Sequence, residues 1–121
     1  MLKKFLLSIL FLGTVFAVEN QKVILITGTA LGIGKSTALH LIEKGHIVYG
    51  GDILIEENLY LNESGGFALE MDVTNQKHID AAIKKIIDEQ GRIDVLVNNA
   101  GLGVYGAIED VSMEDAIYQY D

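Results

Sequence analysis

The sequence KVILITGTALGIGKST at residues 22–37 decides the fold of this chain. Its first six residues are mostly β-branched and apolar, which is typical of a strand that is covered on both faces. A glycine-rich turn follows at residues 28–34, and we expect a helix from about Ile33 to Lys44, ended by Gly45. A buried strand that leads through a glycine-rich turn into a helix predicts a parallel α/β sheet.

The rest of the chain repeats this alternation of apolar runs and helix-period segments. An amphipathic helix is expected from Asn75 to Gln90, and Ser112 has the character of an N-cap that opens another helix. Residues 53–66 are harder to interpret and leave room for a short helix. Three further buried strands are expected at His46–Gly50, Phe67–Met71 and Ile93–Val97. The predicted fold is a Rossmann-like doubly wound parallel sheet, incomplete after four βα units, with the strand order 3-2-1-4.

Composition narrows the classes of function. The length of 121 residues is suited to one small domain. The formal charge of −8 argues against nucleic acid as a partner. It has no cysteine, so disulfides and thiolate metal sites are excluded. The three histidines, at positions 40, 46 and 78, are too far apart in sequence to form a local ligand pair, and we predict no metal site.

The N-terminus differs from the rest of the chain. Lys3 and Lys4 precede an apolar stretch at residues 5–13, and Val15 and Ala17 are small residues suited to a cleavage site. We therefore expect a signal-like leader over residues 1–18, followed by the domain at 19–121. Such a leader indicates export or membrane attachment, whereas a mis-assigned start is the alternative and would leave the protein cytoplasmic.

The glycine-rich turn lies where an α/β sheet binds phosphate. Backbone amides at a helix N-terminus point at an anion, and glycines let a pyrophosphate come close. Gly28, Gly32 and Gly34 follow a Gly-x-x-x-Gly-x-Gly spacing. Glycine spacing alone is weak evidence, so a tight strand–helix connection without a ligand is the alternative.

A nucleoside-triphosphate site is a second alternative. Gly34-Lys35-Ser36-Thr37 resembles the end of a P-loop, whose lysine contacts the β- and γ-phosphates. That motif needs a glycine five positions before Gly34, where Thr29 stands instead. No apolar strand ends in an acid suited to Mg²⁺ in the way this motif requires. The triphosphate hypothesis is therefore much the weaker one.

Polar residues follow the other three predicted strands. Asp52 lies at the end of the second strand, where a carboxylate can accept hydrogen bonds from an adenosine ribose and repel a 2′-phosphate. Asp72-Val73 follow the third strand and Asn98-Asn99-Ala100-Gly101 follow the fourth. All of them lie at carboxyl ends of strands, the edge at which open α/β sheets bind ligands.

The motifs TGTALGIG at 27–34, MDVT at 71–74 and NNAG at 98–101 closely resemble the short-chain dehydrogenase/reductase family. The resemblance covers residues 22–121 and implies an NAD(P)-dependent oxidoreductase that transfers hydride between the nicotinamide and a small alcohol or carbonyl substrate. It implies that Asn99 ties the central strands. The implied cofactor-binding residues are Gly28, Gly32, Ile33 and Gly34 at the pyrophosphate, Asp52 at the adenosine ribose, Asp72 and Val73 at the adenine, and Asn98, Ala100 and Gly101 beneath the cofactor's ribose.

Two of the departures from the family bear directly on function. Asp52-Ile53 stands where many relatives carry arginine, so NAD(H) is expected in preference to NADP(H). No tyrosine is followed four positions later by lysine, so we assign no catalytic residue in this chain and interpret it as the cofactor-binding half of a longer enzyme. The alternative is a non-catalytic dinucleotide-binding module. The fourth strand would be an apolar edge, which favours association, including a homo-oligomer.

Overall fold

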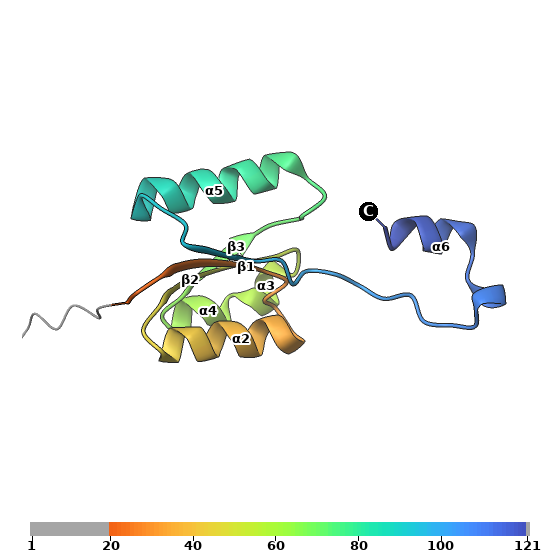
Figure 1. Cartoon of the computed structure of the whole chain (residues 1–121), viewed down its shortest axis with the longest axis horizontal. Helices are drawn as coiled ribbons and strands as arrows, with labels where there is room; N and C mark the ends of the chain where they lie inside the picture. The colour runs from red at the N-terminus through yellow and green to blue at the C-terminus, as the bar shows by residue number, and fades with distance from the viewer. Residues whose placement is uncertain (1–19, 121) are drawn as a thin grey trace, which may run out of the picture.

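The computed structural model describes residues 20–120, which form a four-stranded parallel sheet with helices on both faces (Figure 1). The strand order is β3-β2-β1-β4. The predicted Rossmann-like fold and its strand order are therefore confirmed, whereas the expected leader lies outside the described residues. The strands are β1 (Val23–Thr27), β2 (Ile47–Asp52), β3 (Phe67–Glu70) and β4 (Val95–Val97).

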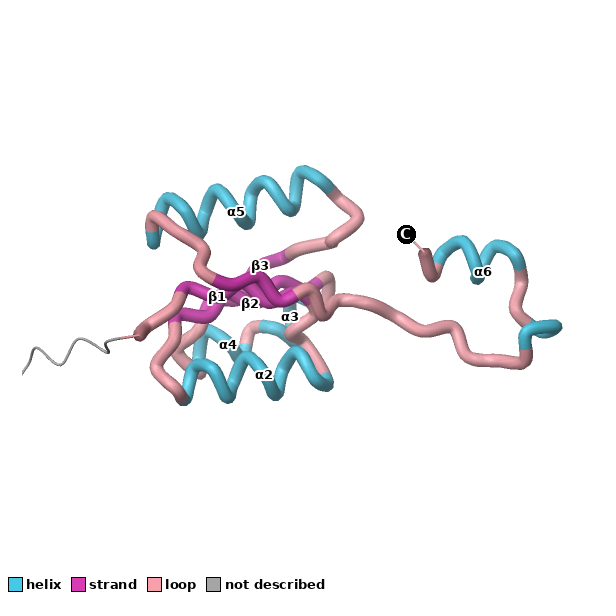
Figure 2. Tube along the Cα trace, viewed as in Figure 1, coloured by secondary structure: helices cyan, strands magenta, loops and turns pink. Residues whose placement is uncertain are grey.

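The helices form two layers around this sheet. In Figure 1, α5 (Gln76–Gln90) lies over one face, and α2 (Gly32–Glu43), α3 (Ile55–Asn58) and α4 (Tyr60–Glu63) lie over the other. A long loop after β4 leads to a short 3₁₀ helix, η1 (Ile108–Asp110), and to α6 (Met113–Tyr118), which lie apart from the sheet (Figure 2). Among residues 20–120, no helix combines the length and the apolar character needed to cross a membrane.

Strand β1 is apolar throughout because its side chains alternate between two cores. Val23 and Leu25 belong to the core beneath α5, and Ile24 and Ile26 to the core beneath α2. All five residues of β1 are buried. Burial on both faces explains why the strand lacks the polar alternation of a half-exposed strand. The glycine-rich turn at its end is consequently attached to a fully buried strand.

The expectation of a buried fourth strand over Ile93–Val97 is wrong. Strand β4 covers only Val95–Val97, and the side chains of Val95 and Leu96 are 40% and 54% exposed. Among the described residues the strand pairs with β1 alone and lies at the edge of the sheet. Just before the strand, the Asp94 carboxylate accepts a hydrogen bond from Val23 N (2.7 Å), and this bond, together with the one from Arg92, lowers the pKa of Asp94.

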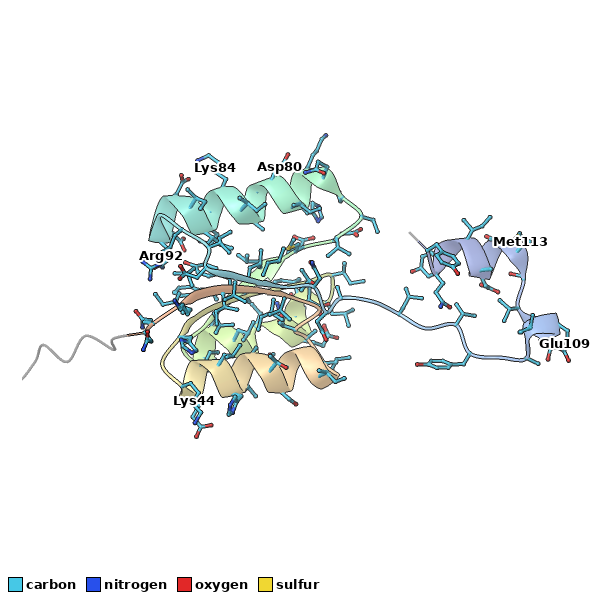
Figure 3. All side chains as sticks on the ribbon, in the orientation of Figure 1. Lys44, Asp80, Lys84, Arg92, Glu109 and Met113 are labelled. Carbon is cyan, nitrogen blue, oxygen red and sulfur yellow. The ribbon has the colours of Figure 1, made fainter. Side chains whose placement is uncertain are left out.

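The other boundaries differ from the expected ones by small shifts. Strand β2 begins one residue later than expected, at Ile47, and ends at Asp52, as expected, where its pairing with β3 also ends. Residues 53–66 contain two short helices instead of one. Asn75 caps α5 by accepting a hydrogen bond from Lys77 N, and Gly91 ends it in the left-handed conformation with φ 74°. Lys84 and Asp80 project from α5 away from the sheet (Figure 3).

Candidate functional site

The turn between β1 and α2 presents a row of backbone amides. The hydrogen bond from Lys35 N to Leu31 O opens α2, and the Leu31 side chain makes no capping bond. The amides of Gly32, Ile33 and Gly34 therefore lack partners within the helix. Gly32 has φ +56° and open space where a Cβ would be, and the Ile33 side chain is 79% exposed. Gly34 is buried, whereas the exposed backbone at Gly32 and Ile33 is open to the approach of an anion.

Two other glycines hold the turn close to its neighbours. A Cβ on Gly34 would lie 1.9 Å from Gly28 O, so only glycine lets the helix approach the end of β1. A Cβ on Gly28 would lie 2.8 Å from the Cα of Ala100. Gly28 also has φ +74°, which disfavours any side chain. These close approaches place the loop after β4 directly beside the turn.

Asn99 joins that loop to β1. Its Nδ2 donates to Thr27 O (3.0 Å) and to Gly28 O (2.9 Å). The Thr27 hydroxyl in turn accepts hydrogen bonds from the amides of Asn99 and Ala100 at 3.0 and 2.9 Å. Asn99 therefore ties the loop after the edge strand β4 to the carboxyl end of β1. The sequence analysis assigned no role to Thr27, whose hydroxyl accepts the bonds from this loop.

Asp52 is bound to the same turn from the other side. Its Oδ2 accepts a hydrogen bond from Ala30 N (2.8 Å), and its Oδ1 accepts one from Leu54 N (2.9 Å). Each carboxylate oxygen has a second lone pair, which leaves acceptor sites for a ligand hydroxyl. The carboxylate thus has a fixed orientation at the end of β2, beside the free amides.

Asp72 lies at the end of β3, next to the half-exposed Val73. Its Oδ1 accepts hydrogen bonds from the hydroxyl (2.7 Å) and the amide (2.9 Å) of Thr74. The hydroxyl makes the larger contribution, and together these bonds lower the pKa of Asp72. His78 Nδ1 accepts from the Asp72 amide (3.2 Å), so this histidine has a structural role here. The carboxylate is consequently ionised and oriented at neutral pH.

Replacing Thr74 by Val is expected to raise the pKa of Asp72 toward its ordinary value. The hydroxyl stabilises the ionised carboxylate, and valine removes it while keeping the shape of the side chain. An NMR titration of the Asp72 carboxyl carbon measures this change, and Thr74→Ser, which keeps a hydroxyl, is the control. An unchanged pKa in Thr74→Val would contradict the assigned cause.

A polar cluster beneath the turn was missed by the sequence interpretation. Thr29 and Asn58 are fully buried, and the hydroxyl of Thr29 donates to Asn58 Oδ1 (2.8 Å). The Tyr60 hydroxyl donates to Thr29 O (2.8 Å), and the Lys35 ammonium lies 4.4 Å from the centre of the Tyr60 ring. Burial, followed by the nearby charge of Asp52, raises the pKa of Tyr60. The sequence offered one indication of this cluster. Asn58 is a polar residue on the same helical face as Leu54 and Leu61, which suggests a buried amide.

The structure brings most of the predicted cofactor-binding residues to one edge of the sheet. Gly28, Gly34, Asp52 and Ala100 are joined through the turn by the contacts described above. Asp72 and Val73 follow the neighbouring strand, whose next residue, Met71, donates its amide to Asp52 O (3.0 Å). Asn98 and Gly101 are exposed and, within residues 20–120, form no hydrogen bond with the turn. Over the same residues no group of three metal-binding side chains is found.

This chain is similar in sequence to proteins of one family. The family model for short chain dehydrogenase matches residues 22–120. The chain is 46% identical over 100 residues to 3-ketodihydrosphingosine reductase of Bacteroides thetaiotaomicron, covering 83% of this chain and 36% of that protein. It is 37% identical over 102 residues to cyclopentanol dehydrogenase of Comamonas testosteroni, covering 79% of this chain and 41% of the relative.

The solved structures agree with this relationship. The 3-ketoacyl-(acyl-carrier-protein) reductase of Brucella melitensis, solved in complex with NADH, superposes with a TM-score of 0.76 at 30% identity. The match covers 81% of this chain and 42% of that one, so the chain spans less than half the length of these relatives. The family match extends over nearly all the described residues, and the motifs that suggested it lie together at one sheet edge. The chain belongs to the short-chain dehydrogenase family of oxidoreductases.

Proposed function

We propose that this chain is the cofactor-binding half of an oxidoreductase that transfers hydride between a nicotinamide dinucleotide and an alcohol or carbonyl substrate. The observation that supports this most strongly is the pairing of free amides with an oriented carboxylate. Gly32, Ile33 and Gly34 offer amides for a pyrophosphate, and Asp52 stands beside them with unused acceptor sites. A pyrophosphate flanked by an adenosine ribose has the chemistry to fill both positions.

The proposed cofactor is NAD(H) in preference to NADP(H). A 2′-phosphate would have to lie against the Asp52 carboxylate, which repels it. The nearby side chains of Leu31 and Ile53 are apolar and exposed, so neither can neutralise the phosphate. The preference therefore depends on the position of one carboxylate.

Each remaining residue of the proposed site has a binding role. Asp72 and Val73 would meet the adenine, and Asn98, Ala100 and Gly101 would pass beneath the second ribose. The bound nicotinamide would supply or accept the hydride. Proton transfer to the substrate oxygen needs an acid such as the family's tyrosine with its lysine partner, and none of the tyrosines here is followed by lysine at the fourth position. We therefore propose that this chain binds cofactor without turning over substrate by itself.

Replacing Ile33 by Glu tests the proposed pyrophosphate site. The side chain is 79% exposed, so the core is unaffected, and an acid in the first turn favours the helix. The new carboxylate would lie beside the phosphates and is expected to weaken NADH binding roughly tenfold or more. Titration calorimetry with NADH measures the change, and Ile33→Gln is the uncharged control of the same size.

The same titrations separate the rival functions. NADH binding that Ile33→Glu weakens and Ile33→Gln retains supports a dinucleotide site at this turn. Binding of ATP with Mg²⁺ but not of NADH would replace the proposal with a triphosphate site. A complete protein that binds NADH and transfers no hydride to any alcohol or carbonyl would favour the non-catalytic module.

A further inference from the structure

A buried polar contact between Thr29 and Asn58 lies beneath the glycine-rich turn, and neither residue is among the proposed cofactor-binding residues. Thr29 and Asn58 are 0% exposed, and both ends of the Asn58 amide are engaged. Its Oδ1 accepts from the Thr29 hydroxyl (2.8 Å), and its Nδ2 donates to Gly50 O (2.8 Å). Burying an amide and a hydroxyl costs free energy unless both are hydrogen-bonded, as they are here.

Thr29 is held by its main chain as well as by its side chain. The Tyr60 hydroxyl donates to Thr29 O (2.8 Å). The Thr29 side chain fits against β2 because Gly50 has no side chain, since a Cβ there would lie 2.4 Å from the Thr29 hydroxyl oxygen. One residue of the phosphate-binding turn is therefore fixed by α3, α4 and β2 together.

These contacts close into a ring that includes Asp52. Thr29 is followed by Ala30, whose amide donates to Asp52 Oδ2 (2.8 Å). The other oxygen of Asp52 accepts from Leu54 N (2.9 Å), and Leu54 O accepts from Asn58 N (3.1 Å) at the start of α3. Asn58 then returns to Thr29. Moving any member of this ring shifts the carboxylate on which the cofactor preference depends.

We propose that the buried Thr29–Asn58 contact, supported by Tyr60, is a positioning device that sets the selectivity of this chain for NADH over NADPH. The proposal rests on the function proposed above. None of these three residues needs to touch the cofactor. They act through Ala30 and Leu54, which fix the direction of the Asp52 carboxylate.

Selectivity depends on this orientation more than pyrophosphate binding does. A fixed carboxylate accepts hydrogen bonds from the ribose of NADH and stands in the way of a 2′-phosphate. Once freed, it can rotate toward water, which weakens the ribose contact and relieves the repulsion of NADPH. The amides of α2 serve both cofactors equally. A loosened ring should therefore lower the NADH affinity and leave the NADPH affinity the same or higher.

The test is a pair of substitutions at Thr29 in the full chain. Thr29→Val keeps the shape but removes the hydroxyl, which leaves Asn58 Oδ1 buried without its donor. Thr29→Ser keeps the hydroxyl. We expect Thr29→Val to lower the ratio of NADH to NADPH affinity roughly tenfold, whereas Thr29→Ser should stay within about twofold of wild type. Calorimetric titration with each cofactor gives both affinities.

The ratio distinguishes positioning from a structural role. Equal losses of NADH and NADPH affinity in Thr29→Val, with the ratio unchanged, would overturn the proposal, because general loosening affects both cofactors alike. Tyr60→Phe removes the hydrogen bond from the Tyr60 hydroxyl to Thr29 O. This substitution should also lower the ratio of NADH to NADPH affinity. Wild-type protein that binds neither cofactor would refute the proposed function. Wild-type protein that binds both equally would overturn the inference together with the proposed preference for NAD(H), and would leave the proposed dinucleotide site standing.

Discussion

Replacing Asp52 by Ala together with Ile53 by Arg is expected to weaken NADH binding about tenfold to a hundredfold and to admit NADPH. The first substitution removes a charge-assisted hydrogen bond to the ribose, worth about 1.5–3 kcal/mol. The second adds a guanidinium, which can bind a phosphate through two parallel hydrogen bonds. Because Ile53 is exposed, the arginine enters solvent and not the core. Fluorescence titration with NADH and NADPH measures both affinities.

Two controls separate the ribose contact from other effects. Asp80→Ala removes one carboxylate, as Asp52→Ala does, but on the outer face of α5, away from the site (Figure 3), and should leave both affinities unchanged. Ile53→Arg alone keeps the carboxylate and should bind NADPH less well than the double variant. If the double variant bound NADH as tightly as wild type, Asp52 would not belong to the ribose site.

Part of the effect will come through the turn itself. Asp52 accepts hydrogen bonds from Ala30 N and Leu54 N, and alanine leaves both amides without this partner. Asp52→Asn keeps one acceptor oxygen and loses the charge. The amide of asparagine can accept from only one of the two backbone N–H groups, so the affinity lost in Asp52→Asn reports the charge together with one turn contact, and the further loss in Asp52→Ala reports the other.

The fold was predictable because each deciding feature is local. The apolar run of β1 is identified as a strand of an α/β sheet by the glycine-rich turn immediately after it. Asn75, which caps α5, and Gly91, which ends it in the left-handed conformation, identify the two ends of that helix. A run of four or five β-branched residues between such signals has few other structures open to it. The strand order then follows from the doubly wound arrangement that such βα units adopt.

The contacts that orient the site were not predictable in this way. Asn58 lies in the stretch 53–66, where acids and leucines alternate without a clear period. Its partner Thr29 is 29 residues away in sequence, and the hydrogen bond between them depends on the space left by Gly50. The prediction that Leu96 would be buried was wrong for a similar reason. Burial of a strand depends on the elements that pack beside it, which its own residues do not reveal.

Replacing Gly34 by Ala is expected to destabilise the fold by about 4 kcal/mol, a large share of the stability of a small domain. The new Cβ would lie 1.9 Å from Gly28 O and 2.5 Å from Asn99 Nδ2. Neither the backbone oxygen nor an amide with two hydrogen bonds can move without breaking the link between β1 and β4. Helix α2 would have to shift away from the turn, so NADH binding should fall as well.

The sign of this effect is the informative result, because helix propensity predicts the opposite. Gly34 lies within α2, where alanine is favoured over glycine by about 1 kcal/mol. Gly91→Ala is the matched control: its φ of +74° gives a strain of about 1–2 kcal/mol, but open space surrounds its Cβ position. Urea unfolding followed by circular dichroism should rank wild type above Gly91→Ala and Gly91→Ala above Gly34→Ala. A Gly34→Ala protein as stable as wild type would show that α2 does not need this close approach.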